Sequence, residues 1–278
     1  MRCATAAPGA AARLAPRCPA APRAPPAAAT PPSLLARAAG NKITALPDLS
    51  LLSGTLTQLQ FNENGVTAWP TLGAATRLTL LDASKNALAG ALPAELGLLT
   101  ALVTLNLSGN KDLDALPEEV GELAALESLN VTGCGLRELP AALAALGGSL
   151  LELALDDNGL ASLALEPGGG EGGGGGSGEG AGARAEAANW ADFSALTTLS
   201  ARRCRIECSA AALPEALFAR TRLSALALGG NAALSAAAVL RLPGCAVFEE
   251  RRAARISKGM TSDGGDAAAD RSFCGLDR

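Results

Sequence analysis

The chain has 278 residues, of which 49% are hydrophobic but only 3% aromatic, and its formal net charge is −4. Histidine is absent, which excludes general acid–base catalysis by histidine and histidine-ligated metal sites. No apolar run approaches the roughly 18 residues that span a bilayer, so we expect no transmembrane segment. Residues 1–47 contain six basic residues and no acidic one, and the acidic remainder of the chain argues against nucleic acid as a partner.

Residues 1–32 are rich in Ala, Pro and Arg and contain no acidic residue. A segment of this composition does not bury a core, so we expect it to be disordered. It also resembles an organellar transit peptide, and the alternative is a tail without a targeting role. The seven cysteines have no disulfide-framework spacing, which favours reduced thiols. We therefore expect an intracellular, cytoplasmic protein, with a plastid or another organelle as the alternative.

The pattern L-x-x-L-x-L-x-x-N-x-L recurs through residues 33–245. Seven clear copies begin at Leu56, Leu78, Leu102, Leu126, Leu150, Leu196 and Leu223, and a degraded copy around Ile43 precedes them. About eight repeats of this length predict an α/β fold, the leucine-rich-repeat solenoid. Its concave face is a curved parallel sheet, and its convex face consists of short helices or irregular segments.

The Asn of each repeat is expected to satisfy backbone groups where the chain turns after the strand. Cys134 and Cys204 stand at the same position, so we interpret them as structural residues of this turn. Cys204 and Cys208 form a C-x3-C pair, but two thiols without further ligands make a poor zinc site. The sequence therefore predicts neither a metal site nor a cofactor.

The repeat is interrupted by a Gly-rich segment at about residues 164–189. Trp190 and Phe193 precede Leu196 by the same offsets that separate convex-side apolar residues from the next repeat, so the repeat resumes at Trp190. No Gly-Lys-Ser/Thr follows the glycines, which favours a flexible insertion over a phosphate-binding loop. Residues 246–278 are predicted to form a C-terminal cap helix and a disordered tail, with Phe248 packed inward and the neighbouring charges outward.

Three stretches of the sequence resemble known families. The Leu-Pro-x-x-Leu/Val-x-x-Leu motif at 116–123 resembles the intracellular Ras-group-related leucine-rich-repeat proteins of plants, whereas 88–97 is closer to the plant receptor type. The Phe-Glu-Glu-Arg-Arg sequence at 248–252 is similar to the tail of a small plant and algal family of about this length. The resemblance covers residues 33 to about 258. It implies protein–protein interaction, often in signalling, without catalytic activity.

The leading hypothesis is therefore a monomeric scaffold or adaptor that binds a protein partner on its concave face, in intracellular signalling. The alternative is a regulatory subunit that modulates a phosphatase or a small GTPase. An enzyme that uses Asp156 and Asp157 as a carboxylate pair is disfavoured, because no pocket-forming sequence surrounds them. Along the concave strip we expect acidic side chains to give way to basic ones. The candidate binding residues are Asn62, Glu63, Asp82, Lys85, Asn106, Glu127, Asn130, Glu152, Asp156, Asp157, Arg202 and Arg203.

Overall fold

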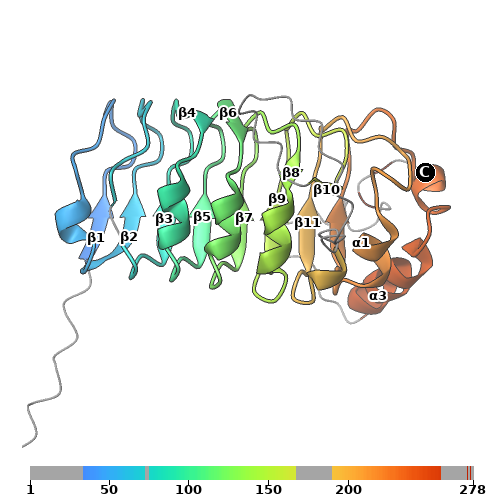
Figure 1. Ribbon diagram of the computed structural model, residues 1–278. Helices are drawn as coiled ribbons and strands as arrows, with labels where there is room; N and C mark the ends of the chain where they lie inside the picture. Colours follow the sequence, from blue (N-terminus) through green and yellow to red (C-terminus); the bar gives the residue numbers. More distant parts are fainter. Residues whose placement is uncertain (1–33, 73–74, 167–189, 258–273, 275, 277–278) are drawn as a thin grey trace, which may run out of the picture. The chain divides into compact units, whose positions relative to one another are not determined.

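Eight short strands form one parallel sheet, with one strand from each repeat (Figure 1). The computed structural model describes residues 34–72, 75–166, 190–257, 274 and 276. The predicted disordered N-terminus and most of the insertion and tail lie outside them. In spatial order, the strands are β1 (Leu34–Arg37), β2 (Leu56–Gln60), β3 (Leu80–Asp82), β5 (Thr104–Asn106), β7 (Ser128–Asn130), β9 (Glu152–Ala154), β11 (Thr198–Ser200) and β12 (Ala225–Ala227).

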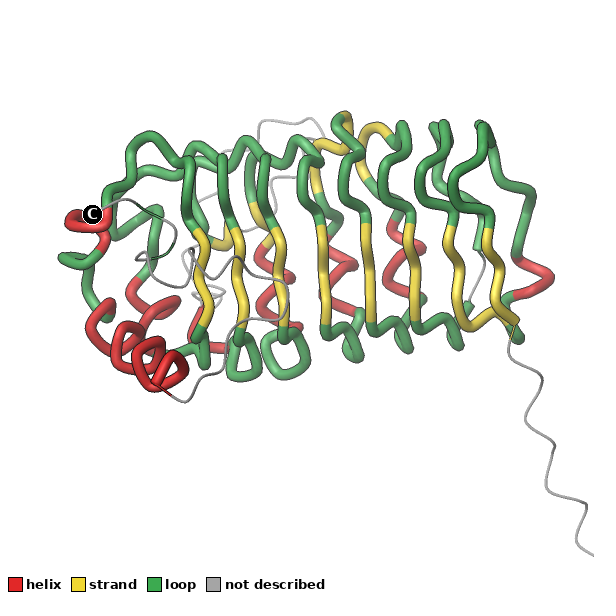
Figure 2. Tube along the Cα trace, turned by 180° about the vertical axis from the view of Figure 1, so that it is seen from behind, coloured by secondary structure: helices red, strands yellow, loops and turns green. Residues whose placement is uncertain are grey.

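The sheet lies on one side of the solenoid and the helical segments lie on the other (Figure 2). The helical segments are η1 (Ser50–Leu52), η2 (Ala94–Leu98), η3 (Glu118–Glu122), η4 (Ala141–Leu146), η5 (Trp190–Asp192), α1 (Glu215–Ala219) and α2 (Ala236–Val239). Those labelled η are 3₁₀ helices. Two parallel strand pairs, β4 (Ala89–Ala91) with β6 (Asp112–Ala115) and β8 (Leu139–Pro140) with β10 (Leu165–Glu166), lie in the connections. The predicted parallel sheet with short convex helices is confirmed.

The Leu-Pro pairs determine where the 3₁₀ helices begin. Pro93, Pro117 and Pro140 are the N-cap residues of η2, η3 and η4, all with extended backbones. The proline ring fixes φ at about −65°, and proline lacks an N–H group that would need a partner. It is therefore well tolerated where a helix starts. The leucine before each proline is buried, which anchors the helix start to the core.

The core is a stack of leucines between the two layers. The middle residue of each three-residue strand points inward and pairs in register with its counterpart, as Leu105 does with Leu81 and Leu129. The side chains of Leu81, Leu105 and Leu129 are at most 1% exposed. Full burial of one leucine stabilises the fold by roughly 1.5–3 kcal/mol. Because the stack is continuous, each repeat depends on its neighbours for stability.

The stack continues across the insertion, because β9 and β11 pair directly. Trp190 and Phe193 are both buried, with ring centroids 4.7 Å apart, and Trp190 Nε1 donates a hydrogen bond of 2.6 Å to the carbonyl of Leu163. The repeat therefore resumes at Trp190, as its spacing predicts. Leu165 belongs to β10 although the sequence analysis assigned it to the insertion.

Helix α3 (Cys245–Ser257) packs on the last repeats through Phe248, whose ring lies 6.2 Å from that of Phe218. Its charges do not all point outward, contrary to the expectation. Arg252 is only 8% exposed and pairs with Glu249, while Arg251 donates to the backbone carbonyls of Phe218 and Thr221. Arg251 attaches the cap to α1, because it satisfies carbonyls at and just after the end of that helix.

Two residues of the predicted tail, Cys274 and Leu276, are described, and both are buried. The N–H of Leu228, just after β12, donates to the carbonyl of Cys274 at 2.8 Å. The equivalent N–H of Leu155 donates to Ser200 of the following repeat. Cys274 therefore takes the place of a further repeat at the open edge of the sheet, so this part of the tail is packed against the solenoid.

Candidate protein-binding surface

The solvent-facing side of the sheet, here called the sheet face, presents two outward residues from each of its three-residue strands. Alternate residues of a strand point to opposite sides, so those next to each buried leucine face outward. Parallel pairing aligns them in rows, such as Asp82–Asn106–Asn130 across β3, β5 and β7. The sheet face consists of Gln58, Gln60, Leu80, Asp82, Thr104, Asn106, Ser128, Asn130, Glu152, Ala154, Thr198, Ser200, Ala225 and Ala227.

The centre of the sheet face, over β5 and β7, carries no charge. Asn106 Oδ1 accepts a hydrogen bond of 3.1 Å from the N–H of Ser108, and Asn130 Oδ1 accepts one of 3.1 Å from the N–H of Thr132. These bonds fix both amides with the oxygen toward the backbone. Among the described residues, neither NH₂ group has a hydrogen-bond partner. Two adjacent amides therefore offer donors at the middle of the sheet.

Asp82, at the end of β3, and Asp156, in the turn after β9, have structural roles. Asp82 Oδ1 accepts from the N–H and the hydroxyl of Ser84, at 3.0 and 2.6 Å. Asp156 Oδ1 accepts from the N–H of Arg202 and the hydroxyl of Ser200 in the next repeat, at 2.6 and 2.5 Å. Ser200 replaces the Asx residue of its own repeat, so Asp156 caps the neighbouring turn instead. Sequence reasoning missed both roles. The Asx-x-Ser/Thr spacing of Asp82 and Ser84 is a known signal of such turns, whereas the bonds of Asp156 to the next repeat leave no local signal.

The predicted change from acidic to basic residues does not leave a row of unpaired charges along the sheet face. Lys85 Nζ lies 2.7 Å from Glu63 Oε1, and the guanidinium of Arg203 pairs with both carboxylate oxygens of Asp157. Hydrogen bonding from Arg203 holds the pKa of Asp157 below its ordinary value, and Lys85 does the same for Glu63. These four charges neutralise each other in pairs, because residues at one repeat position become neighbours when repeats stack.

The remaining predicted residues surround this centre without forming a cluster of their own. Glu127 and Glu152 are exposed, and Arg202 and Asn62 are half-buried. None of the three charged residues has an ion pair within the described part of the chain. Thus the structure brings together Asn106 and Asn130, and separately the two ion pairs. It leaves Glu127, Glu152 and Arg202 as isolated charges around them.

The turn after each strand passes through a left-handed backbone conformation. The residue there has φ between +51° and +78° in seven successive repeats, namely Glu63, Lys85, Gly109, Gly133, Asp157, Arg203 and Gly230. A side chain in this conformation costs of order 1–2 kcal/mol relative to glycine. Gly109 and Gly133 hold this position after β5 and β7, so beside the neutral centre no side chain projects from the left-handed position of the turn. A partner's backbone therefore has closer access there than over the ion pairs.

The hypothesis of a catalytic carboxylate pair gains no support from this geometry, because Asp156 and Asp157 are each engaged by a different residue of the next repeat. Over the described ranges, no three His, Cys, Asp or Glu side chains are placed to share a metal ion. In the same ranges, every helix is too short or too polar to cross a membrane.

No protein-family model matches the sequence, and neither does any curated protein. Solved structures do resemble it. A TDR receptor has a TM-score of 0.50 and 25% identity over 66% of this chain and 28% of its own. A leucine-rich-repeat protein of Leptospira interrogans has 0.49 and 22%, over 78% and 52%. The ectodomain of the Arabidopsis thaliana receptor kinase GASSHO1/SCHENGEN3 has 0.47 and 22%, over 66% and 19%.

The chain thus spans between about a fifth and about half of the length of these proteins. They do not single out a subgroup of leucine-rich-repeat proteins. The recurring leucine pattern and the single parallel sheet of eight strands, one from each repeat, show that this chain has the leucine-rich-repeat fold.

Proposed function

We propose that this protein is a non-catalytic scaffold or adaptor that holds a protein partner on its sheet face. Solenoids typically use their extended sheet surface for binding. The observation that carries the proposal is the neutral centre, where Asn106 and Asn130 lie in register and their amide donors have no partner among the described residues. Hydroxyl groups of Thr104 and Ser128 stand beside them on the same strands.

This chemistry fits an uncharged segment of a partner that exposes backbone or side-chain carbonyl groups. The two asparagines supply donors that are already oriented, so little side-chain entropy is lost when they bind. Salt-dependent attraction from Glu63, Lys85, Asp157 and Arg203 contributes little, since these four charges are already paired. Glu127 and Glu152 remain as unpaired charges near the centre, within the described part of the chain. We place the partner in intracellular signalling, because the described cysteines are free thiols and the resemblance to the plant proteins points there.

The test is affinity purification with mass spectrometry, comparing the wild-type chain with a double variant, Asn106→Asp and Asn130→Asp. Asp82 occupies the same row, so aspartate fits the position and retains the oxygen that caps the turn. The exchange removes the NH₂ donors without removing the fold. We expect the double variant to lose most of the partner, at least about tenfold, which corresponds to about 1.4 kcal/mol.

The control is Glu122→Lys, an exposed position on the helical side of the solenoid. It should capture the same partner as the wild type. Equal capture by the double aspartate variant, with an unchanged melting temperature, would show that the partner does not use the sheet face. Loss of capture in Glu122→Lys alone would move the binding surface to the helical side.

A further inference from the structure

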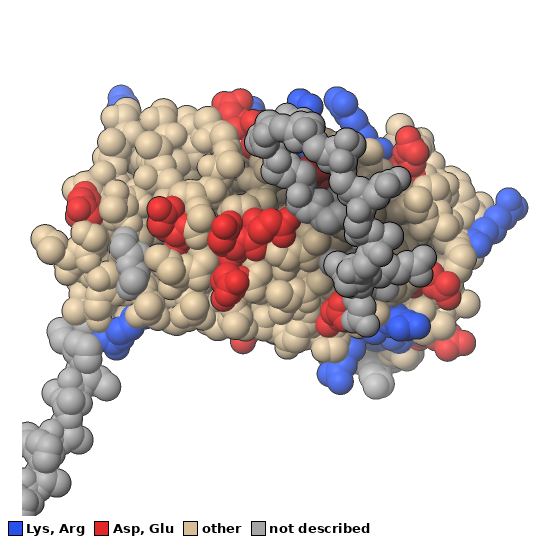
Figure 3. Space-filling model, in the orientation of Figure 1, with Lys and Arg blue, Asp and Glu red and all other residues tan. Residues whose placement is uncertain are grey.

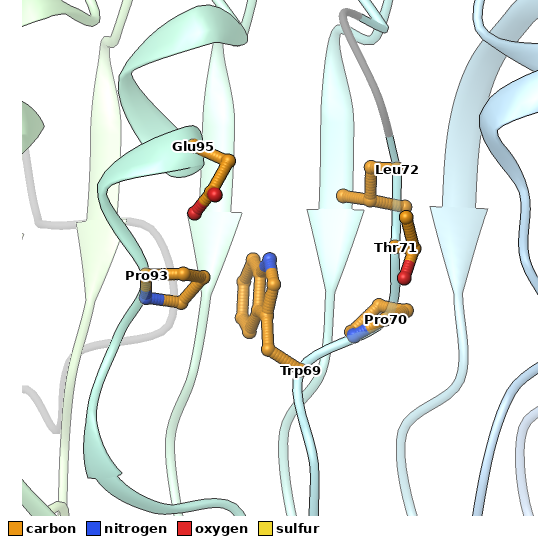
Figure 4. A pocket seen from close by; sticks show the side chains of 6 residues that line it. All are labelled: Trp69, Pro70, Thr71, Leu72, Pro93 and Glu95. Carbon is orange, nitrogen blue, oxygen red and sulfur yellow. The ribbon is translucent and has the colours of Figure 1, made fainter.

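A pocket opens on the side of the solenoid opposite the sheet face (Figure 4). Its volume is about 260 Å³, and it is lined by Trp69, Pro70, Thr71, Leu72, Pro93 and Glu95. The lining comes from two consecutive repeats. The pocket is smaller than a typical drug-sized site but large enough for one long side chain.

The pocket results from a departure in the Leu-Pro pattern. Trp69–Pro70 occupies the place that Leu92–Pro93 occupies in the next repeat. Leu92 is 5% exposed, whereas the larger indole of Trp69 is only half-buried. The indole therefore remains at the surface as one wall, and two prolines and Leu72 add further apolar surface.

Glu95 provides the charge at this pocket. It belongs to η2, is exposed, and has no ion-pair partner within the described ranges. Its carboxylate points toward the indole of Trp69 (Figure 4). The site thus combines an aromatic ring, an aliphatic wall and a carboxylate, which together match a cation carried on an apolar stem.

The surrounding surface has the same sign of charge. Glu118, Glu119 and Glu122 lie on the neighbouring helix η3, and neither η2 nor η3 contains Lys or Arg. Acidic side chains gather in the middle of this face of the molecule (Figure 3). A positively charged segment is therefore attracted to this face, and a negatively charged one is repelled.

We propose that this pocket binds an arginine side chain from a basic segment of a partner protein. The guanidinium group stacks on Trp69 and donates to the carboxylate of Glu95, while its methylene groups contact Pro70 and Pro93. Arginine fits better than lysine, because its planar group combines stacking on an aromatic ring with two parallel hydrogen bonds to a carboxylate. This site is separate from the sheet face and does not depend on the function proposed there.

The experiment titrates the full-length, ¹⁵N-labelled protein with the peptide acetyl-Ala-Arg-Ala-Arg-Ala-amide. The protein has two indole N–H signals, and that of Trp190 is a built-in control, because its N–H is buried and bonded to Leu163. We expect the Trp69 signal to shift and saturate while the Trp190 signal stays in place. The same peptide with citrulline, a neutral group of the same shape, should leave both signals unchanged.

Three variants test the roles of the residues. Trp69→Leu restores the residue of the neighbouring repeats, so it should fold and lose the binding. Because it lacks the Trp69 indole signal, its binding is read from the backbone amide signals of Thr71 and Leu72, which line the pocket and should no longer shift with the peptide. Glu95→Gln should weaken binding by about three- to fivefold, the range expected for an exposed ion pair. The matched variant Glu122→Gln, on the same face outside the pocket, should change it by less than twofold.

Equal binding of the citrulline peptide would overturn the proposal, since the charge would then have no role. Equal losses in Glu95→Gln and Glu122→Gln would also overturn it, because they would indicate a general attraction to the acidic face. A Trp69 signal that does not shift at millimolar peptide would show that the pocket does not take arginine.

Discussion

Replacement of Asn158 by alanine should destabilise the solenoid more than any exchange on its sheet face. This side chain is 6% exposed, and its Oδ1 accepts from the N–H groups of Cys134 and Leu136, at 3.1 and 3.0 Å. Its Nδ2 donates to the carbonyl of Val131 at 2.9 Å. Alanine leaves these three groups without that partner in the interior. At roughly 1–3 kcal/mol for each buried unsatisfied group, the loss should be at least about 3 kcal/mol.

Urea unfolding followed by circular dichroism measures this loss, with Asn62→Ala as the control. Asn62 lies just after β2 in the first clear repeat and is half-buried, but its side chain makes no hydrogen bond within the described residues. The loss of unfolding free energy in Asn62→Ala should therefore stay near about 0.5 kcal/mol or below. Asn158→Cys should fall between the two, since Cys204 Sγ already donates to a backbone carbonyl at the corresponding position, at 3.3 Å. A loss below about 1 kcal/mol for Asn158→Ala would refute the reasoning, because water would then replace the amide at little cost.

Three further outcomes follow from particular residues. Gly135→Ala should destabilise the protein by several times the roughly 1–2 kcal/mol expected for Gly133→Ala, and urea unfolding compares the two variants. Both glycines have positive φ, but of the two only Gly135 would place the new Cβ 2.6 Å from a backbone oxygen, that of Lys111. Arg203→Gln should raise the pKa of Asp157 toward 3.8, and NMR titration detects the shift. In the wild type, the lowered pKa of Asp157 contributes stability above pH 3.8, and this contribution is lost on acidification. Burial raises the pKa of Cys134 to about 11, so a thiol reagent at pH 8 should label it only after unfolding.

The parts of the fold that could be predicted from the sequence are those that every repeat must supply. Leu105 and its counterparts recur because each must fill the same space between the layers, and Asn158 and its counterparts recur because each must bond the same backbone groups. Trp190 was placed correctly for the same reason, since only one offset lets it enter the stack. Because these structural requirements recur in every repeat, the residues that meet them recur in the sequence at the same spacing.

The candidate site was less predictable because its side chains are not bound by that constraint. Asp157 and Arg203 are 46 residues apart, and their pairing depends on the stacking of β9 on β11 across the insertion. Alignment of the repeats would have shown that they are neighbours, but not that they neutralise each other. The pocket at Trp69 left a sequence signal as well, a tryptophan in a leucine position, but its opening depends on how far the indole enters the core.

The sheet face and the Trp69 pocket lie on opposite sides of the solenoid, with the leucine stack between them. The protein partner of the sheet face and the arginine side chain in the pocket should therefore bind independently of each other. No described hydrogen bond joins the two sets of residues, and exchanges at separated sites without shared partners usually add within about 0.5 kcal/mol. Trp69→Leu should therefore leave partner capture by the sheet face intact. Likewise, the Asn106→Asp and Asn130→Asp variant should keep the affinity for the arginine peptide within about twofold. If either variant abolished binding at the opposite face, the two surfaces would be coupled through the repeats, and a scaffold with two independent sites would be the wrong description.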